Sequence, residues 1–419
     1  MARPSSTTQS SSWLSDGVLL VSANLVAAVA NYLFQATMKR SLSWSEFGYL
    51  NSTVSLIIFT SLPLTAASQT MTHHLAQVHK RDEPEKIAEL QAASLKLLRR
   101  LTWVIFALSA LLIYPVSEFL RFPRFSLAGI GLLWIPVILW SALGGSWCSG
   151  LSRFRLLAGL LILSAVIRLV AGAIAAHFYP WAESGLIATI LSGVAMAAVA
   201  LFSPHHATPA RMRAILFQRT FLAYGAASLA VTFAAYVFLH GDQIIAQRYF
   251  PGEELGRYTG AGLLGRAIIW ACVPLLTVYF THRSGHDSTR PVTNRLPWFF
   301  LALLVTGVIF VALFRGLLLR IFLGEHDASM DAYAARFAVN ILPIGVLQLL
   351  GTHCLAARRL PECLLIGLCG IIYLFAMILF GVTPSDMLTC MGLVPTISLL
   401  VVGGFMLARH GHFSTASGS

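Results

Sequence analysis

Two short stretches decide the fold of this chain: residues 40–48 read RSLSWSEFG, and residues 248–256 read RYFPGEELG. Both follow the pattern R-x5-E-x-G, and the second copy begins 208 residues after the first (248 − 40). Because the chain has 419 residues, this offset is close to half of its length. The repeat therefore predicts two related halves, which we place at residues 1–210 and 211–419.

The composition around these stretches is that of a membrane protein. Apolar residues make up 57% of the chain, and charged residues only 11%, against about 25% in ordinary soluble domains. A membrane-spanning helix needs about 20 apolar residues, so the apolar content sets a ceiling of about twelve spans. This balance excludes a secreted disulfide scaffold, a disordered chain and a cytosolic enzyme.

Apolar segments recur along the whole chain with short polar breaks between them. We predict twelve spans, at residues 16–37, 49–76, 101–120, 127–150, 156–178, 184–203, 218–240, 258–281, 297–322, 335–356, 362–382 and 387–408. Only helices and closed barrels satisfy their backbone hydrogen bonds in lipid, and the alternating ten-residue strands of a barrel are absent from the sequence. The predicted fold is therefore an all-α polytopic membrane protein.

The basic residues between the predicted spans indicate an orientation. If the N-terminus is inside, eighteen Lys and Arg residues fall on the inside and six on the outside. Basic residues concentrate in cytoplasmic loops, so we predict that both termini are cytoplasmic. The net charge of +12 is then mostly a topology signal, and we expect no nucleic-acid partner.

Other signals in the sequence are weak. The six cysteines lie in or beside apolar stretches without a CxxC pair, so we interpret them as small buried residues and expect no metal. The first fifteen residues lack the cleavage signature of a signal peptide, and the first apolar stretch is expected to be a retained span. The polar break at residues 79–100 has apolar residues at helical spacing and predicts a cytoplasmic amphipathic helix.

The two copies of the repeat both fall in an outside loop after an odd-numbered predicted span. Six spans in each half make this a parallel repeat, with an axis along the membrane normal. Two six-helix lobes around a central cavity are the architecture of an alternating-access carrier, and this is the architecture that we predict.

Ionisable residues deep inside a span are costly and are candidates for function. Arg168 lies in the middle of the fifth span, where it either lines a cavity or pairs within its half. Arg266 in the eighth span and Asp242 near the outer end of the seventh contact substrate or pair with each other. Asp242 and His73 are the candidates for binding a coupling ion. Arg315 and Arg320 lie near a span end and are expected to extend to the lipid headgroups.

Polar side chains recur at helical spacing on four of the predicted spans. Each stripe either lines the cavity or forms hydrogen bonds between helices. The stripes consist of Asn24, Asn31 and Gln35 in span one, Thr65, Gln69 and His73 in span two, Tyr224, Ser228, Thr232 and Tyr236 in span seven, and Asn340, Gln348 and Thr352 in span ten.

Three groups of residues carry a family resemblance: Asn31-Tyr32 with Ser43-Trp44-Ser45-Glu46-Phe47-Gly48, Leu62-Pro63 with Gln69, and Gly241-Asp242-Gln243 with Glu254-Leu255-Gly256-Arg257-Tyr258. They resemble the polysaccharide flippases of the Wzx type, within the multidrug/oligosaccharidyl-lipid/polysaccharide (MOP) exporter superfamily. Where many relatives carry arginine near the end of the second span, this chain has His73-His74.

The resemblance implies a flippase of the bacterial inner membrane that moves an undecaprenyl-diphosphate-linked oligosaccharide from the cytoplasmic to the periplasmic leaflet, for O-antigen or other surface polysaccharide. It also implies a central, often cationic cavity, H+ or Na+ coupling, and association with other polysaccharide-assembly membrane proteins. Three alternatives stay open: a cation-coupled multidrug antiporter, a lipid II exporter, and a membrane-embedded polymerase, ligase or glycosyltransferase. We expect no enzyme and no cofactor, because GxSxG and P-loop motifs are absent from the sequence and no long outside loop exists.

Overall fold

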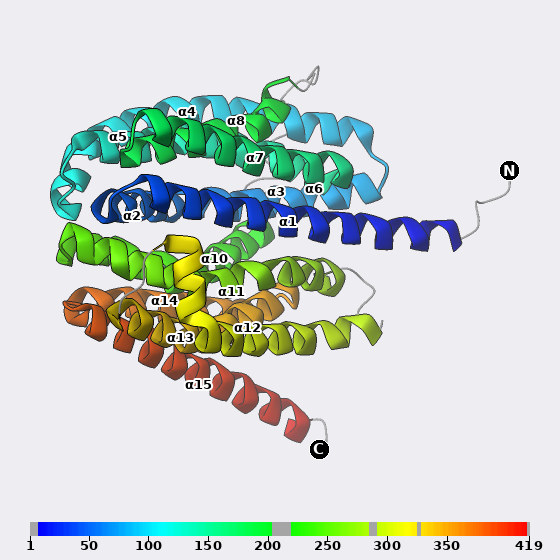
Figure 1. Ribbon diagram of the computed structural model, residues 1–419. Helices are drawn as coiled ribbons and strands as arrows, with labels where there is room; N and C mark the ends of the chain where they lie inside the picture. The colour runs from blue at the N-terminus through cyan, green and yellow to red at the C-terminus, as the bar shows by residue number, and fades with distance from the viewer. Residues whose placement is uncertain (1–6, 203–218, 285–290, 325–327, 417–419) are drawn as a thin grey trace, which may run out of the picture.

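The computed structural model describes residues 7–202, 219–284, 291–324 and 328–416 (Figure 1). These residues form helices joined by short connections, and they contain no strand. The first part of the chain forms α1 (Thr7–Ser41), α2 (Trp44–Thr60), α3 (Leu62–Lys80), α4 (Pro84–Leu120), α5 (Phe125–Leu133), α6 (Ile135–Gly150), α7 (Phe154–Phe178) and α8 (Ala182–Phe202). The second part forms α10 (Arg219–Tyr249), α11 (Gly252–Ser284), α12 (Pro291–Leu323), α13 (Ala328–Ala356), α14 (Leu360–Phe380) and α15 (Pro384–Ala416).

The helices confirm the predicted multi-pass, all-α fold. Within the described residues, ten helices are long and apolar enough to cross a membrane, and α2 with α3 makes an eleventh if the bent pair is one span. The predicted first span, 16–37, lies within α1, which is not among these helices, so the predicted total of twelve is approximate. The predicted boundary between the halves, at residue 210, lies outside the described residues.

Two predicted spans are each divided into two helices. The span at 49–76 consists of α2 and α3, which meet at Ser61 with a bend of 48°. The span at 127–150 consists of α5 and α6, which meet at Trp134. Pro63 and Pro136 stand in the first turn after each break. Proline fits the first turn of a helix but not its interior, because it has no N–H to donate.

Most of the segment at 79–100 is helical, as predicted, but this helix is continuous with the next predicted span. Residues 79–80 end α3, and residues 84–100 form the beginning of α4, which runs without a break for 37 residues, or about 55 Å at 1.5 Å per residue. Its apolar stripe packs on the protein rather than on a membrane surface. Leu90, Leu95 and Leu98 form a buried cluster with Leu75 of α3 and Trp147 of α6.

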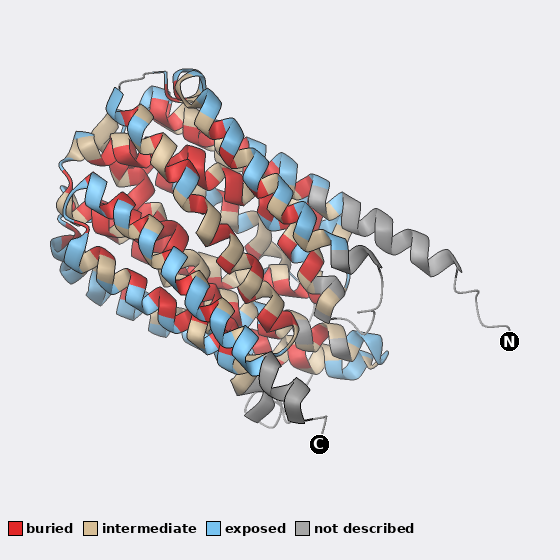
Figure 2. Cartoon of the chain, turned by 90° about the horizontal axis from the view of Figure 1, so that it is seen from below, coloured by how far each residue is buried: buried red, intermediate tan, exposed pale blue. Residues whose placement is uncertain are grey.

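Burial separates the inside of the bundle from a lipid-facing outside. Figure 2 shows buried positions along the interior and exposed positions along the outer helix faces. The exposed faces are apolar: on α4, Trp103 is 74% and Leu111 is 75% exposed. Large exposed apolar patches in a soluble protein would be a liability, so these faces fit contact with lipid.

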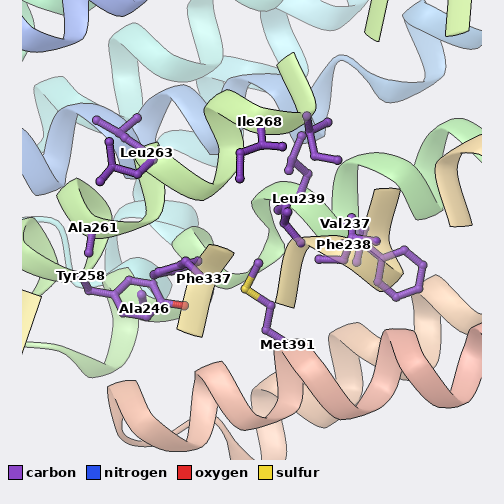
Figure 3. Packing of buried hydrophobic residues seen from close by; sticks show 14 of the residues in the cluster. Val237, Phe238, Leu239, Ala246, Tyr258, Ala261, Leu263, Ile268, Phe337 and Met391 are labelled. Atoms are coloured by element: carbon purple, nitrogen blue, oxygen red, sulfur yellow. The ribbon is translucent and has the colours of Figure 1, made fainter. Parts of the chain in front are cut away.

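The helices of the two halves occupy different parts of the molecule. In Figure 1, α1–α8 lie in the upper part and α10–α15 in the lower part. Hydrogen bonds join the halves along α2, α3 and α10, from Ser55 to Gln243 and from Ser228 to Gln69. The main buried apolar cluster continues from α10 and α11 into α13 and α15, where Phe337 and Met391 contribute to it (Figure 3).

Candidate functional site

The most deeply buried charges of the described residues are an ion pair between α10 and α11. Asp242 is 0% and Arg266 is 1% exposed, and Nη2 of Arg266 lies 2.5 Å from Oδ2 of Asp242. Nε of Arg266 donates to the carbonyl of Leu239 at 2.8 Å, and the hydroxyl of Tyr258 donates to the same Asp242 oxygen at 3.0 Å. Of the two interpretations of these charges from sequence, the pairing with each other is the one that the structure shows.

Several polar atoms around this pair are left without a partner. Oδ1 of Asp242, Nη1 of Arg266 and the hydroxyl of Tyr373 are all buried and make no hydrogen bond to the described residues. The guanidinium lies over the ring of Phe337, 5.3 Å from its centroid. A side chain at Gly262 would collide with Nη1, so this position must remain small. The pair therefore keeps one carboxylate oxygen and one guanidinium N–H with which to bind a proton, ion or ligand.

His240, which is not among the residues predicted from sequence, extends this polar cluster. It is buried on α10 two residues before Asp242, with Nδ1 unpartnered. Its ring stacks with those of Tyr236 and Trp270, at centroid distances of 6.1 and 6.5 Å. The signal that could have identified it was an imidazole two residues before a carboxylate inside one apolar span.

Arg168 occupies a different environment, between α7 and α1. Its Nη1 donates to the amide oxygen of Asn31 at 3.3 Å, and its guanidinium lies 4.4 Å from the centroid of Phe34. Nε of Arg168 is buried without a hydrogen-bond partner. No carboxylate among the described residues pairs with it. The structure thus brings Arg168 and Asn31 together and leaves the positive charge without a counter-ion.

The other polar candidates are dispersed over the bundle. Asn24 donates to the carbonyl of Leu20 in its own helix, at 2.8 Å, whereas Gln35 is buried with its amide oxygen unpartnered. Gln69 accepts from the hydroxyl of Ser228, at 2.6 Å, across the two halves. The side chain of His73 lies outside the described residues.

In the second half, the polar stripe of α13 forms hydrogen bonds between helices. Asn340 donates to the carbonyl of Leu388 of α15 at 2.6 Å, and Gln348 donates to the carbonyl of Ala235 of α10 at 3.5 Å. Both contacts correspond to the interhelical alternative stated from the sequence. The structure therefore groups the candidates into an Arg168–Asn31 site in the first half and an Asp242–Arg266 site in the second.

A third charged group, at the end of the bundle that carries the repeated sequence, joins α2, α5 and α8. Arg124 binds Glu46 at 2.6 Å and Glu183 at 2.9 Å, and Glu46 also accepts from the backbone N–H of Ala182. Burial alone would lower the pKa of Arg124, but its hydrogen bonds and charge interactions with Glu46 and Glu183 raise it. The guanidinium also covers the ring of Trp181. This group fixes the first copy of the repeat within its own half.

Comparison with known proteins finds similarity in structure but not in sequence. No protein-family profile matches the chain, and no curated protein matches it. An inward-facing multidrug resistance MATE transporter of the MOP superfamily superposes with a TM-score of 0.67 at 12% identity, over 96% of this chain and 99% of that one. The lipid II flippase MurJ in an inward closed conformation gives 0.66 at 13% identity, over 93% and 86%.

A MOP superfamily transporter from Pyrococcus furiosus, described as having a binding pocket of reversed polarity, gives a TM-score of 0.65 at 13% identity, over 94% of this chain and 95% of that one. The chain therefore has the fold that these transporters share, and this fold occurs both in drug exporters and in a lipid flippase. At such low identity the likeness shows the fold alone.

Proposed function

We propose that this chain is a MOP superfamily transporter that flips a polyprenyl-diphosphate-linked oligosaccharide from the cytoplasmic to the periplasmic leaflet. Its two halves, near residues 1–210 and 211–419, would alternate around a central cavity, and both termini would be cytoplasmic. The sugar headgroup would cross between the halves while the lipid tail stays in the bilayer.

The proposal of an anionic substrate rests on one observation. The charge of Arg168 lies in the middle of α7 and has no carboxylate partner within the described residues. A charge in the middle of a membrane-spanning helix that is not neutralised by the protein is costly, and a negatively charged ligand would offset that cost. Arginine suits a diphosphate because its planar guanidinium binds two oxygens at once. Asn31, in contact with Arg168, adds an amide that can hydrogen-bond a phosphate or a sugar hydroxyl.

The second charged site supports coupling to H+ or Na+. Asp242 has an unpartnered carboxylate oxygen beside Arg266, so a cation bound there would compete with the guanidinium for the carboxylate. Such competition would loosen α10 from α11 and could link ion binding to the movement of the second half. In this scheme the first half binds the anion and the second half binds the ion.

The test is reconstitution in liposomes with a labelled polyprenyl-diphosphate sugar, following the label between leaflets under H+ and Na+ gradients. The Arg168→Ala variant should lose at least about tenfold in initial rate, as expected for a charge-assisted contact of about 1.5–3 kcal/mol. Arg168→Lys should retain part of the rate. The matched control is Arg155→Ala, on the exposed start of the same helix, and its rate should not change.

A cation-coupled multidrug antiporter is the second candidate. The fold is shared with MATE transporters, and a buried carboxylate with a free oxygen is a group that a proton or cationic compound can use. Deletion of the gene should sensitise cells to cationic drugs in that case, with surface glycan unchanged. If instead glycan is lost and drug sensitivity is unchanged, the antiporter is excluded. No transfer of the labelled lipid under either gradient would overturn the flippase proposal.

A further inference from the structure

The two copies of the repeated sequence contact each other across the two halves, at one end of the bundle. We call this the repeat end; it contains residues 40–48 and 248–256. Gly48 of α2 lies against Gly256 of α11: a Cβ on Gly48 would lie 3.0 Å from the backbone N of Gly256. Such a contact between equivalent residues is typical of an interface related by a two-fold axis.

Three glycines on α11 form the surface that receives α2. Gly252, Gly256 and Gly260 are four residues apart, so they share one face of the helix. A Cβ at Gly256 would collide with the carbonyl oxygen of Trp44, and one at Gly260 would lie 3.1 Å from the ring of Trp44. Small residues at this spacing let two helices approach closely in a membrane. The first copy of the repeat is thus packed directly on the second half.

The arginines of the two copies add a reciprocal contact. Arg40, at the end of α1, donates from Nη2 to the carbonyl of Ile321 near the end of α12, at 2.6 Å. Its counterpart Arg248, at the end of α10, donates from Nη1 to the carbonyl of Phe119 near the end of α4, at 2.7 Å. Each arginine therefore reaches from its own half to the other half.

Both acceptors lie in the last turn of a helix. The last carbonyls of a helix have no partner inside it and carry a partial negative charge, so a guanidinium is a suitable cap. The guanidinium of Arg248 also lies over the ring of Phe119, 4.6 Å from its centroid. The same residue type, at the same place in each copy, makes the same kind of contact in opposite directions.

We infer that the R-x5-E-x-G repeat is a conformational latch that holds the repeat end of the transporter closed. The glycine packing sets how closely α2 and α11 approach, and Arg40 and Arg248 fasten each half to the other. Opening at this end requires both arginines to release their carbonyls. On the proposed orientation this is the periplasmic end, and the latch rests on the alternating access of the proposed function but not on its substrate.

The test measures how often the repeat end opens, with no substrate present. A thiol is introduced by Ser52→Cys, because Ser52 is buried on the face of α2 that also carries Gly48 and Ser55, and those two residues contact the second half. Labelling by a membrane-impermeant maleimide is followed from each side of membrane vesicles. Peptide mass spectrometry resolves this position from the native cysteines.

The arginines are removed singly and together, as Arg40→Ala and Arg248→Ala. An exposed charge-assisted hydrogen bond of about 1 kcal/mol corresponds to about fivefold in an equilibrium. Labelling from the repeat-end side should therefore rise about fivefold for each single variant and about twenty-fivefold for the double, since independent contributions multiply. The matched control is Arg257→Ala, because Arg257 is at the same end and pairs with Glu253 of its own helix.

The inference is overturned if the double variant, still monodisperse, labels within twofold of its Ser52→Cys parent. It is also overturned if Arg257→Ala raises the labelling as much as the latch variants do. If the double variant does not fold, the two single variants carry the same test at fivefold each. Because labelling needs no lipid-linked sugar, a failed flippase assay with a positive labelling result would reject the substrate and keep the latch.

Discussion

Breaking the buried Asp242–Arg266 pair from the carboxylate side should be the most damaging single change to this protein outside the apolar core. Asp242→Asn preserves the shape of the side chain but leaves the guanidinium buried and uncompensated, at 1% exposure. The arginine cannot reduce the cost of this buried charge by losing its proton, because a guanidinium stays protonated in proteins. Removing one partner of a buried ion pair costs about 3–5 kcal/mol.

This free energy converts to a shift in unfolding temperature. At about 2.1 cal/mol/K of unfolding entropy per residue, a chain of this length has about 0.9 kcal/mol/K, so the loss corresponds to about 3–6 °C. Arg266→Met should cost less than Asp242→Asn, because a buried carboxylate can be neutralised by a proton. The double variant should recover at least about 2 kcal/mol relative to the sum of the single losses.

The measurement is the apparent unfolding temperature in detergent, at a fixed scan rate because unfolding of a large membrane protein is not expected to be reversible. The matched control is Asp82→Asn, an exposed aspartate in the left-handed conformation (φ 53°) that asparagine also tolerates. Its unfolding temperature should stay within about 1 °C of the unmodified protein. Strictly additive losses in the double variant would show that the two side chains do not stabilise each other and would refute the reasoning.

Three further predictions concern local packing and charge. Gly262→Ala should lower the unfolding temperature through about 1–3 kcal/mol of overpacking against Arg266, whereas Gly403→Ala, with no atom within 4 Å of the added methyl, should be neutral or slightly stabilising; equal shifts would contradict the steric argument. Glu183→Gln should cost about 1 kcal/mol because it weakens the bond to the partly exposed Arg124, and the difference from the unmodified protein should shrink in high salt. Asn340→Leu should cost about 1 kcal/mol by removing the interhelical hydrogen bond to the Leu388 carbonyl, and an unchanged unfolding temperature would show that this bond contributes nothing.

Composition and hydropathy were sufficient to predict the helices, because lipid imposes one solution on a long apolar segment. They could not predict the break at Ser61 or the continuity of α4. A proline near a break fits either a kink or the first turn of a new helix, and the stripe of Leu90, Leu95 and Leu98 fits a membrane surface as well as the protein interior. Only the position of the neighbouring helices decides between such alternatives.

Among the polar contacts too, some could be predicted from the sequence and others could not. The pairing of Asp242 with Arg266 was foreseeable, because two opposite charges in adjacent apolar spans seldom remain apart. The contact of Arg168 with Asn31 was not, since nothing in the two segments specifies that α7 packs on α1. The glycine face of α11 was visible as three glycines at four-residue spacing, but its partner Trp44 depends on how the halves meet.

The two halves share equivalent packing contacts at the repeat, but they do not carry equivalent charges. Shifted by the offset of 208, the positions of Asp242 and Arg266 correspond to Phe34 and Ile58, and that of Arg168 corresponds to Ala376. The arginine contacts at the repeat end and the approach of Gly48 to Gly256 involve equivalent residues, whereas the charges of Asp242, Arg266 and Arg168 each occur in one half only. A two-fold arrangement needs equivalent contacts where the halves meet, because both halves must open and close on the same surface. In the proposed function, the anion binds at Arg168 and the coupling ion at Asp242, so placing these two sites in separate halves would let one be occupied without neutralising the other.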